Sequence, residues 1–143
     1  MKSLSALGVL LMVAGLLGLF YTQSLFSASS VVIAVQIAAA VLMVWARVTF
    51  GRRSFHATAT TTEGGLVTSG PYRYIRNPIY TSVVIFSVAG AAANLSWSSV
   101  VFALVVLAGA LVRVVAEERF LRSRYPEYAE YAARTKRMVP HVF

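Results

Sequence analysis

Four long apolar runs occupy most of this chain of 143 residues and constrain its fold more than any other feature. At a rise of about 1.5 Å per residue, each run is long enough as a helix to cross most of a hydrocarbon layer of about 30 Å. The runs span residues 4–21, 31–48, 79–95 and 100–116. We therefore predict an all-α integral membrane protein with four transmembrane helices.

The connections between these runs differ in length and charge. Residues 22–30 and 94–99 are short and uncharged, which predicts two helical hairpins, one from the first two runs and one from the last two. Residues 49–77 form a long connection that carries four Arg. Because Lys and Arg concentrate in cytoplasmic loops, we expect this connection and both termini to lie on the cytoplasmic side of the cell membrane.

The chain therefore divides into a scaffold, residues 1–48, and a functional core, residues 49–143. After the fourth run the helix is expected to continue until Pro126, which suits the first turn of a new helix reaching about residue 135. We expect this short helix to be amphipathic and to lie against the membrane or over the long connection. The first run follows Lys2 as a secretory signal would, but it exceeds a signal core of about 7–15 residues, so we expect it to be retained.

Composition narrows the function classes. The chain is 58% apolar and only 13% charged, which excludes a large soluble domain. Its net charge of +8 is explained by membrane topology, so we expect no nucleic-acid partner. The chain has no Cys, and His56 and His141 stand alone, so we expect neither a thiolate nucleophile nor a metal site.

A polar segment from residue 70 to residue 80 precedes the third run. Asn77 and Pro78 predict a helix start, with the Asn side-chain oxygen capping free amides. A helix start with Arg beside it also attracts a carboxylate or phosphate, and both interpretations remain open. The Tyr residues suit a membrane-interface belt or the binding of an adenine ring. The candidate binding residues are Gly70, Tyr72, Arg73, Tyr74, Arg76, Asn77, Pro78 and Tyr80.

A second polar group ends the fourth run. Arg113 and Glu117 lie one helical turn apart, where ionisable groups are costly in a membrane. They form either an interfacial salt bridge, with Glu118 paired to Arg122, or a site that binds a cofactor and an anionic substrate. Further along, we expect Tyr128 and Tyr131 to share a helix face.

Three ordered motifs resemble the isoprenylcysteine carboxyl methyltransferase family of integral-membrane methyltransferases. They are Gly70-Pro71-Tyr72-Arg73-Tyr74-Ile75-Arg76-Asn77-Pro78-Ile79-Tyr80, Arg113-x-x-x-Glu117-Glu118, and Tyr128-x-x-Tyr131-x-x-Arg134 followed by Pro140. The resemblance covers about residues 64–143, whereas the first two runs match only as generic apolar helices.

The resemblance implies S-adenosylmethionine as methyl donor and S-adenosylhomocysteine as product. The donor carboxylate would meet the helix start at Asn77 to Tyr80. Its adenosine part would contact Tyr72, Tyr74, Tyr128, Tyr131 and Pro140. A hydrophobic acceptor would enter from the bilayer, with Arg113, Glu117 or Glu118, and Arg134 near the point of transfer.

Two positions depart from the family pattern. The family has Arg-His-Pro-x-Tyr-x-Gly, whereas this chain has Asn77 in place of His and Ser82 in place of Gly. No proton-transfer role can therefore be carried over to Asn77, although it can still form hydrogen bonds. Ser82 narrows the approach to the third run.

The expected reaction is methyl transfer to an isoprenoid or lipid-like acceptor. A carboxylate acceptor is ionised at neutral pH and needs no strong base. One alternative is an NADPH-dependent reductase related to sterol reductases, with Arg52, Arg53 and Arg73 as a basic clamp. Another is a small four-helix transporter, although the first three runs have no ionisable residue at mid-depth and only Gln36 as a strongly polar group there. The oligomeric state stays open, because Gly8, Gly15 and Gly18 suit packing within one chain or between two.

Overall fold

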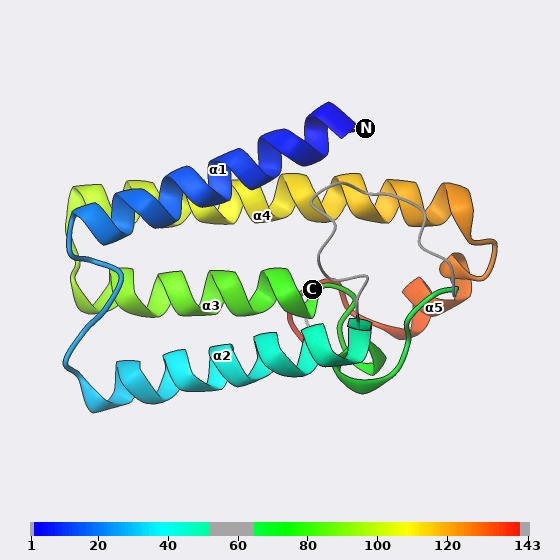
Figure 1. The fold of residues 1–143 in the computed structure, drawn as a ribbon, viewed down its shortest axis with the longest axis horizontal. Coiled ribbons are helices and arrows are strands. Elements are labelled where there is room, and N and C mark those ends of the chain that lie inside the picture. Colours follow the sequence, from blue (N-terminus) through cyan, green and yellow to red (C-terminus); the bar gives the residue numbers. More distant parts are fainter. Residues whose placement is uncertain (1, 52–64, 141–143) are drawn as a thin grey trace.

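The computed structural model describes residues 2–51 and 65–140, and in these ranges the chain is helical (Figure 1). A single isolated bridge, between Ile75 and Lys136, is the only β-type pairing in the described ranges. The elements are α1 (Lys2–Tyr21), α2 (Ser30–Phe50), the 3₁₀ turn η2 (Gly70–Arg73), α3 (Pro78–Ala93), α4 (Trp97–Arg124) and α5 (Tyr128–Arg134). The all-α prediction is confirmed for this part of the chain.

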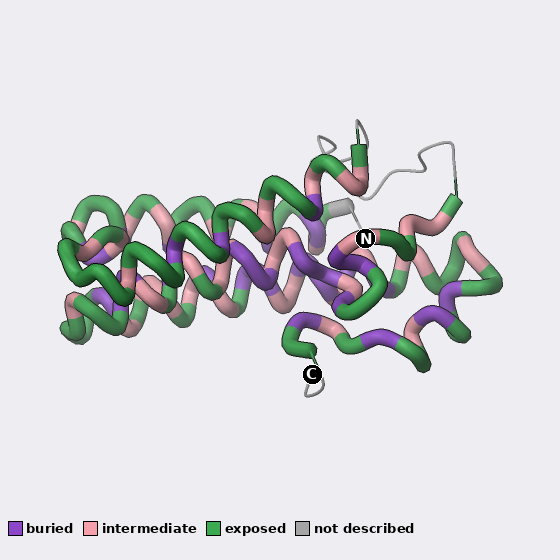
Figure 2. Tube along the Cα trace, turned by 90° about the horizontal axis from the view of Figure 1, so that it is seen from below, coloured by how far each residue is buried: buried purple, intermediate pink, exposed green. Residues whose placement is uncertain are grey.

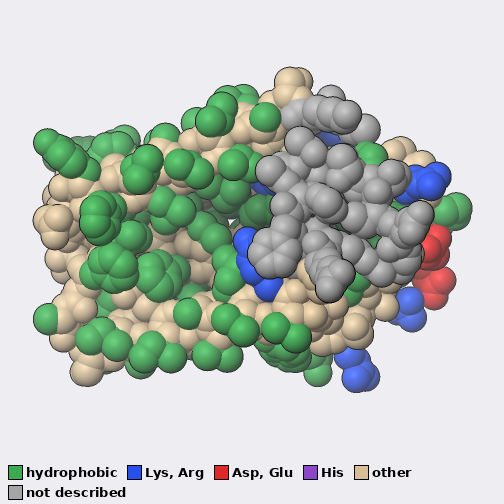
Figure 3. Space-filling model, viewed as in Figure 1, with side chains coloured by type: hydrophobic (Ala, Val, Ile, Leu, Met, Phe, Trp, Pro, Cys, Tyr) green, Lys and Arg blue, Asp and Glu red, His purple; other side chains and the backbone are tan. Residues whose placement is uncertain are grey.

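Three of the helices, α1, α2 and α4, are long and apolar enough to cross a membrane. The third predicted span corresponds to α3, which has 16 residues and a length of about 24 Å, so it is shorter than the three candidate spans. Hydrophobic side chains cover the part formed by the long helices, and charged side chains gather toward the end that holds α5 (Figure 3). This distribution is the one expected of helices in lipid with a polar end in water.

The helices pack in the order α1, α4, α3, α2 rather than as two hairpins (Figure 1). The predicted pairing of α3 with α4 is confirmed, but the prediction that α1 and α2 form a hairpin is wrong. These two helices lie on opposite flanks, because the connection between them crosses the end of α3. A side chain at Gly90 would collide there with the backbone of Leu25.

Polar side chains hold this crossing in place. The amide of Gln36 donates to the carbonyl oxygens of Leu25, at 2.7 Å, and Phe86, at 3.1 Å. Asn94 Nδ2 donates to the carbonyl of Phe26 at 2.8 Å. Gln36, the polar residue that the transporter hypothesis singled out, thus forms hydrogen bonds that join α2 to α3 and to the preceding connection.

Glycines bring α1 and α4 into close contact within one chain. A Cβ at Gly8 would lie 2.8 Å from the carbonyl oxygen of Gly109, and one at Gly18 would lie 2.2 Å from the ring of Phe102. Gly15 meets α4 in the same way. Of the two alternatives for these glycines, the structure therefore has packing within the chain.

The C-terminal part follows the sequence prediction closely. Helix α4 continues to Arg124, and α5 begins two residues after Pro126. Tyr128 and Tyr131 share its buried face, with ring centroids 5.9 Å apart. In Figure 2, α1 and α2 are largely exposed, whereas buried stretches recur where the C-terminal segment folds against the start of α3 and the end of α4.

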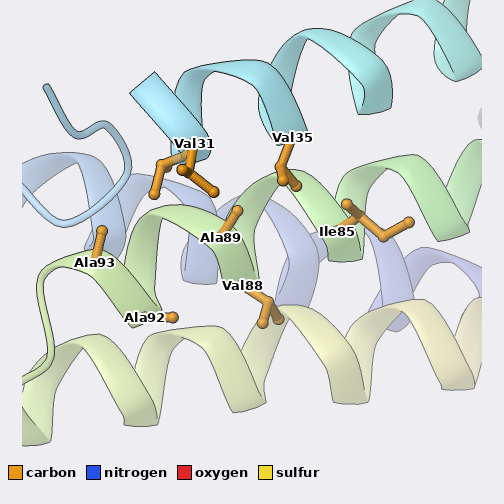
Figure 4. A pocket seen from close by; sticks show the side chains of 8 residues that line it. Val31, Val35, Ile85, Val88, Ala89, Ala92 and Ala93 are labelled. Atoms are coloured by element: carbon orange, nitrogen blue, oxygen red, sulfur yellow. The ribbon is translucent and has the colours of Figure 1, made fainter. Parts of the chain in front are cut away.

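An apolar groove of about 470 Å³ lies between the start of α2 and the end of α3, away from α5 (Figures 1 and 4). Small and branched aliphatic side chains line it, and polar groups contribute almost nothing to its surface. The lining residues are Val31, Val32, Val35, Ile85, Val88, Ala89, Ala92 and Ala93.

Candidate active site

The turn η2 begins at a glycine because no other residue fits there. Gly70 has a φ of +57°, and a Cβ would lie 2.6 Å from Thr49 Oγ1. Tyr72 is buried, and its ring packs 5.5 Å from that of Phe50. Local packing therefore accounts for Gly70 and places the motif at the end of α2.

Residues 135–140, which we call the C-terminal strap, run alongside the segment before α3. The amide of Lys136 donates to the carbonyl of Tyr74 at 3.2 Å, and the amide of Arg76 donates to the carbonyl of Lys136 at 2.8 Å. Thr81 Oγ1 then donates to the carbonyl of Met138 at 2.8 Å. Two segments about 60 residues apart in the chain thus lie side by side.

Glu118 joins three segments through both of its carboxylate oxygens. Oε1 accepts from Arg76 Nε and from Asn77 Nδ2, each at 3.1 Å. Oε2 lies 3.2 Å from both Nε and Nη2 of Arg137. Arg76 also donates to the carbonyls of Ala132, at 2.9 Å, and Thr135. We call Arg76, Asn77, Glu118 and Arg137 the Glu118 cluster, which connects α4, the start of α3 and the strap.

This cluster corrects two predictions. The alternative that paired Glu118 with Arg122 is wrong, because Glu118 binds residues far along the chain. Asn77 does occupy the cap position of α3 with Pro78 in the first turn, but its side chain makes no capping hydrogen bond. Its amide instead donates to Glu118 and to the carbonyl of Arg137, at 3.0 Å. A buried carboxylate attracts this donor more strongly than helix amides attract its oxygen.

A second cluster, formed by Ser5, Tyr80, Arg113 and Glu117, lies on the neighbouring face of α4. Arg113 Nη2 and Glu117 Oε1 are 2.8 Å apart, so the predicted salt bridge is confirmed. The Tyr80 hydroxyl donates to Glu117 Oε1 at 2.8 Å and accepts from Arg113 Nε at 2.7 Å. Arg113 Nη1 donates to Ser5 Oγ on α1. We call these four residues the Arg113 cluster.

The two clusters differ in how far their carboxylate side chains are exposed. The Glu118 side chain is 4% exposed, whereas that of Glu117 is 27% exposed. The Arg113 side chain is 5% exposed. Glu117 is therefore the carboxylate that remains accessible at the end of α4.

Two buried tyrosines link α5 to the rest of the site. The Tyr131 hydroxyl donates to the carbonyl of Tyr72 at 2.7 Å, so α5 lies over the long connection, one of the two predicted placements. The Tyr128 side chain is 1% exposed, yet its hydroxyl has no hydrogen-bond partner among the described residues. The guanidinium carbon of Arg122 lies 5.8 Å from its ring centroid.

Burial alters the acidity of these phenols. It raises the pKa of Tyr128 to about 12, with the charge of Glu118 adding to the effect. Burial likewise raises the pKa of Tyr72 and Tyr131 above the ordinary value for tyrosine. All three hydroxyls are therefore protonated donors at neutral pH.

Four predicted site residues are exposed and belong to neither cluster. Arg73, Tyr74 and Pro140 are exposed. Arg134 is also exposed, and it forms the predicted pair with Glu130 at 3.5 Å. Their roles toward a cofactor or acceptor stay predictions. Arg52, Arg53, His56 and His141 lie outside the described residues.

Two residues of the clusters were not identified from the sequence. Arg137 follows the last motif without a recognisable pattern, and Ser5 lies in what was expected to be scaffold. A partial signal existed for Arg137, because a buried carboxylate requires several donors and one neighbouring Arg rarely suffices. The sequence offers no corresponding signal for Ser5.

Comparison with known proteins decides the family. A family model described as phospholipid methyltransferase matches residues 29–128, most of the chain. The chain belongs to the phospholipid methyltransferase family. This family includes the integral-membrane methyltransferases that resemble isoprenylcysteine carboxyl methyltransferase, so the resemblance noted in the sequence is confirmed.

A curated relative covers a shorter stretch. Over 80 residues the chain is 41% identical to the cobalt-zinc-cadmium resistance protein CzcN of Cupriavidus metallidurans. The match covers 54% of this chain and 36% of that protein, so the chain spans about a third of the relative's length. Within residues 2–51 and 65–140, no three His, Cys, Asp or Glu side chains gather in a way that could hold a metal ion. No solved structure matches the chain.

Proposed function

We propose that the protein is an S-adenosylmethionine-dependent methyltransferase of the membrane that acts on a hydrophobic, isoprenoid or lipid-like acceptor. Family membership supports methyl transfer. The observation that carries the proposal is the meeting of the three separated motifs, because Glu118 joins the segment before α3 to the strap while Glu117 holds Arg113 and Tyr80 beside it.

The residues of η2, the start of α3 and α5 suit the binding of an adenosine-bearing donor. The Tyr128 hydroxyl is a buried donor without a partner in the described chain, which is a costly arrangement unless a ligand accepts from it. Tyr72 and Tyr131 supply aromatic surface next to it, and the start of α3 suits the donor's carboxylate. Gly70, Arg76, Asn77 and Pro78 shape this region through the backbone and the Glu118 cluster. When bound, the donor supplies an electrophilic methyl group on a sulfonium.

The Arg113 cluster is suited to the acceptor side of the reaction. Arg113 is held by Tyr80 and Glu117, so its guanidinium is oriented before a substrate arrives. An anionic acceptor group would bind Arg113, and the Glu117 carboxylate would offer negative charge to a cationic donor. If the acceptor is a carboxylate, no side chain has to remove a proton. The protein then acts by positioning reactants and excluding water.

The proposed orientation follows from the distribution of charge. The start of α1, the end of α4 and α5 lie toward the same end of the bundle (Figure 1). Arg119, Arg122 and Arg124 are exposed at this end. By the preference of Lys and Arg for cytoplasmic loops, we place this end and both termini in the cytoplasm.

Methyl transfer from labelled S-adenosylmethionine into a membrane lipid extract tests the proposal. We expect a labelled lipid product with the wild-type protein and at least about a hundredfold less with Glu117→Gln. Calorimetric titration of the purified protein with S-adenosylhomocysteine should give saturable heat. Absence of both product and heat at millimolar ligand would overturn the proposal, and quenching of nicotinamide fluorescence by the protein would instead favour a reductase.

A further inference from the structure

The first helix reaches the Arg113 cluster through one side chain. Ser5 is fully buried, and its hydroxyl oxygen accepts a hydrogen bond from Arg113 Nη1. Helix α1 lies outside the part of the chain that matches the family model, which begins at residue 29. A residue that the family motifs do not include therefore contacts the guanidinium at the centre of the proposed site.

The position of Ser5 is set by the packing of two glycines. Gly8 and Gly109 face each other so closely that a Cβ on either would lie 2.8 or 2.7 Å from the other's carbonyl oxygen. Helices α1 and α4 run in opposite directions. Ser5 lies one turn before Gly8 on α1, and Arg113 lies one turn after Gly109 on α4, so the two side chains are next to each other. The glycine contact thus fixes the register on which the hydrogen bond depends.

Three partners hold the guanidinium group of Arg113. Tyr80 binds Nε, Glu117 binds Nη2, and Ser5 binds Nη1, so each of the three guanidinium nitrogens is held from a different element. Loss of the Ser5 contact would remove the hydrogen bond that restrains Nη1 and so loosen the orientation of the guanidinium. A misplacement of about 1 Å in a positioning group can cost about a hundredfold in rate.

We infer that Ser5 is a positioning residue of the methyltransferase, which holds the Arg113 guanidinium in the orientation that the acceptor requires. This inference rests on the proposed function and extends the reaction site to α1, beyond the expected functional core of residues 49–143. Ser5 acts through Arg113 and does not itself touch the reacting groups.

The test compares Ser5→Ala with Ser3→Ala, which removes an exposed hydroxyl on the same helix. In lipid-extract methyl transfer, we expect kcat to fall about tenfold for Ser5→Ala and to stay unchanged for Ser3→Ala. The affinity for S-adenosylhomocysteine, measured by calorimetry, should be unchanged in both variants, because the proposed donor contacts lie at η2, the start of α3 and α5. Ser5→Thr, which restores a hydroxyl, should recover most of the rate.

A register variant separates positioning from general disruption. Gly8→Ala should push α1 away from α4 and lower kcat although the Ser5 hydroxyl is present. The double variant with Ser5→Ala should lose no more than the larger single loss. Wild-type kcat in Ser5→Ala, or failure of Ser5→Thr to recover the rate while it binds S-adenosylhomocysteine normally, would overturn the inference. If the wild-type protein transfers no methyl group at all, the proposed function fails first.

Discussion

Glu117 and Glu118 are neighbours on α4, but their carboxylates belong to two regions of different character. Successive residues of a helix point about 100° apart, so Glu118 faces the strap while Glu117 faces Tyr80 of α3. Glu118 is enclosed and bound through both oxygens, whereas more than a quarter of the Glu117 side chain is exposed. The Glu118 cluster therefore stabilises the fold, and we propose that the Arg113 cluster takes part in the reaction.

The largest effect is expected from Glu118→Gln. The substitution leaves the nearly buried Arg76 guanidinium without its carboxylate, which should cost about 3–5 kcal/mol of folding free energy. Thermal unfolding in detergent measures the loss, and proteolysis should release the C-terminal strap. Glu130→Gln, at an exposed pair, is the control and should unfold as the wild-type protein does.

Glu117→Gln should separate activity from stability. We expect turnover to fall at least about a hundredfold, since the negative charge beside Arg113 is lost. Its unfolding temperature should fall less than that of Glu118→Gln, because Tyr80 and Ser5 still bind Arg113. If Glu117→Gln unfolds more readily than Glu118→Gln and retains activity, the assignment of the two clusters has to be exchanged.

A milder change to the second cluster is Tyr80→Phe. It removes the hydroxyl that bridges Arg113 and Glu117 but leaves their ion pair at 2.8 Å. We expect about a tenfold fall in kcat and a loss of about 1 kcal/mol of stability. Tyr21→Phe, at an exposed position outside the site, provides a matched control.

Tyr128→Phe should act in opposite directions on the empty and the ligand-bound protein. Because the buried hydroxyl has no partner in the described chain, its removal should raise stability by about 1 kcal/mol. The same change should weaken S-adenosylhomocysteine binding in calorimetry. Unchanged affinity would remove Tyr128 from the proposed binding site.

The smallest effect at neutral pH concerns the acidity of Tyr128. Its pKa in the folded state is raised to about 12, so the folded protein favours the neutral phenol. This contribution to stability is fully present below about pH 10 and is lost as the pH rises through about 12. Unfolding measured from pH 8 to 12 should show this loss in the wild-type protein and a smaller one in Tyr128→Phe.

The sequence predicts the helices well because their apolar runs are long and continuous. Helix α1 begins only two residues before the predicted span, and Pro126 correctly ends the continuation of α4. Local ion pairs, such as Arg113 with Glu117, were also predictable from helical spacing. Contacts set by tertiary packing were not, as the misassigned partner of Glu118 shows.

The remaining errors have a common physical origin. Residue spacing reveals which side chains share a turn, but it does not reveal which distant segment arrives beside them. Asn77 was expected to cap its own helix, but its side-chain amide donates a hydrogen bond to Glu118, about 40 residues further along the chain. Likewise, two short connections suggested two hairpins, although only the second pair of helices packs as one.

The separation of α1 from α2 has a consequence for how the protein is made. During synthesis the first two helices emerge before either of their partners exists, so both must be stable in lipid as single helices. Insertion and assembly are therefore distinct stages. The bundle forms only when α3 and α4 pack between α1 and α2. A ribosome that stops early would leave two lone helices and no bundle for them to join.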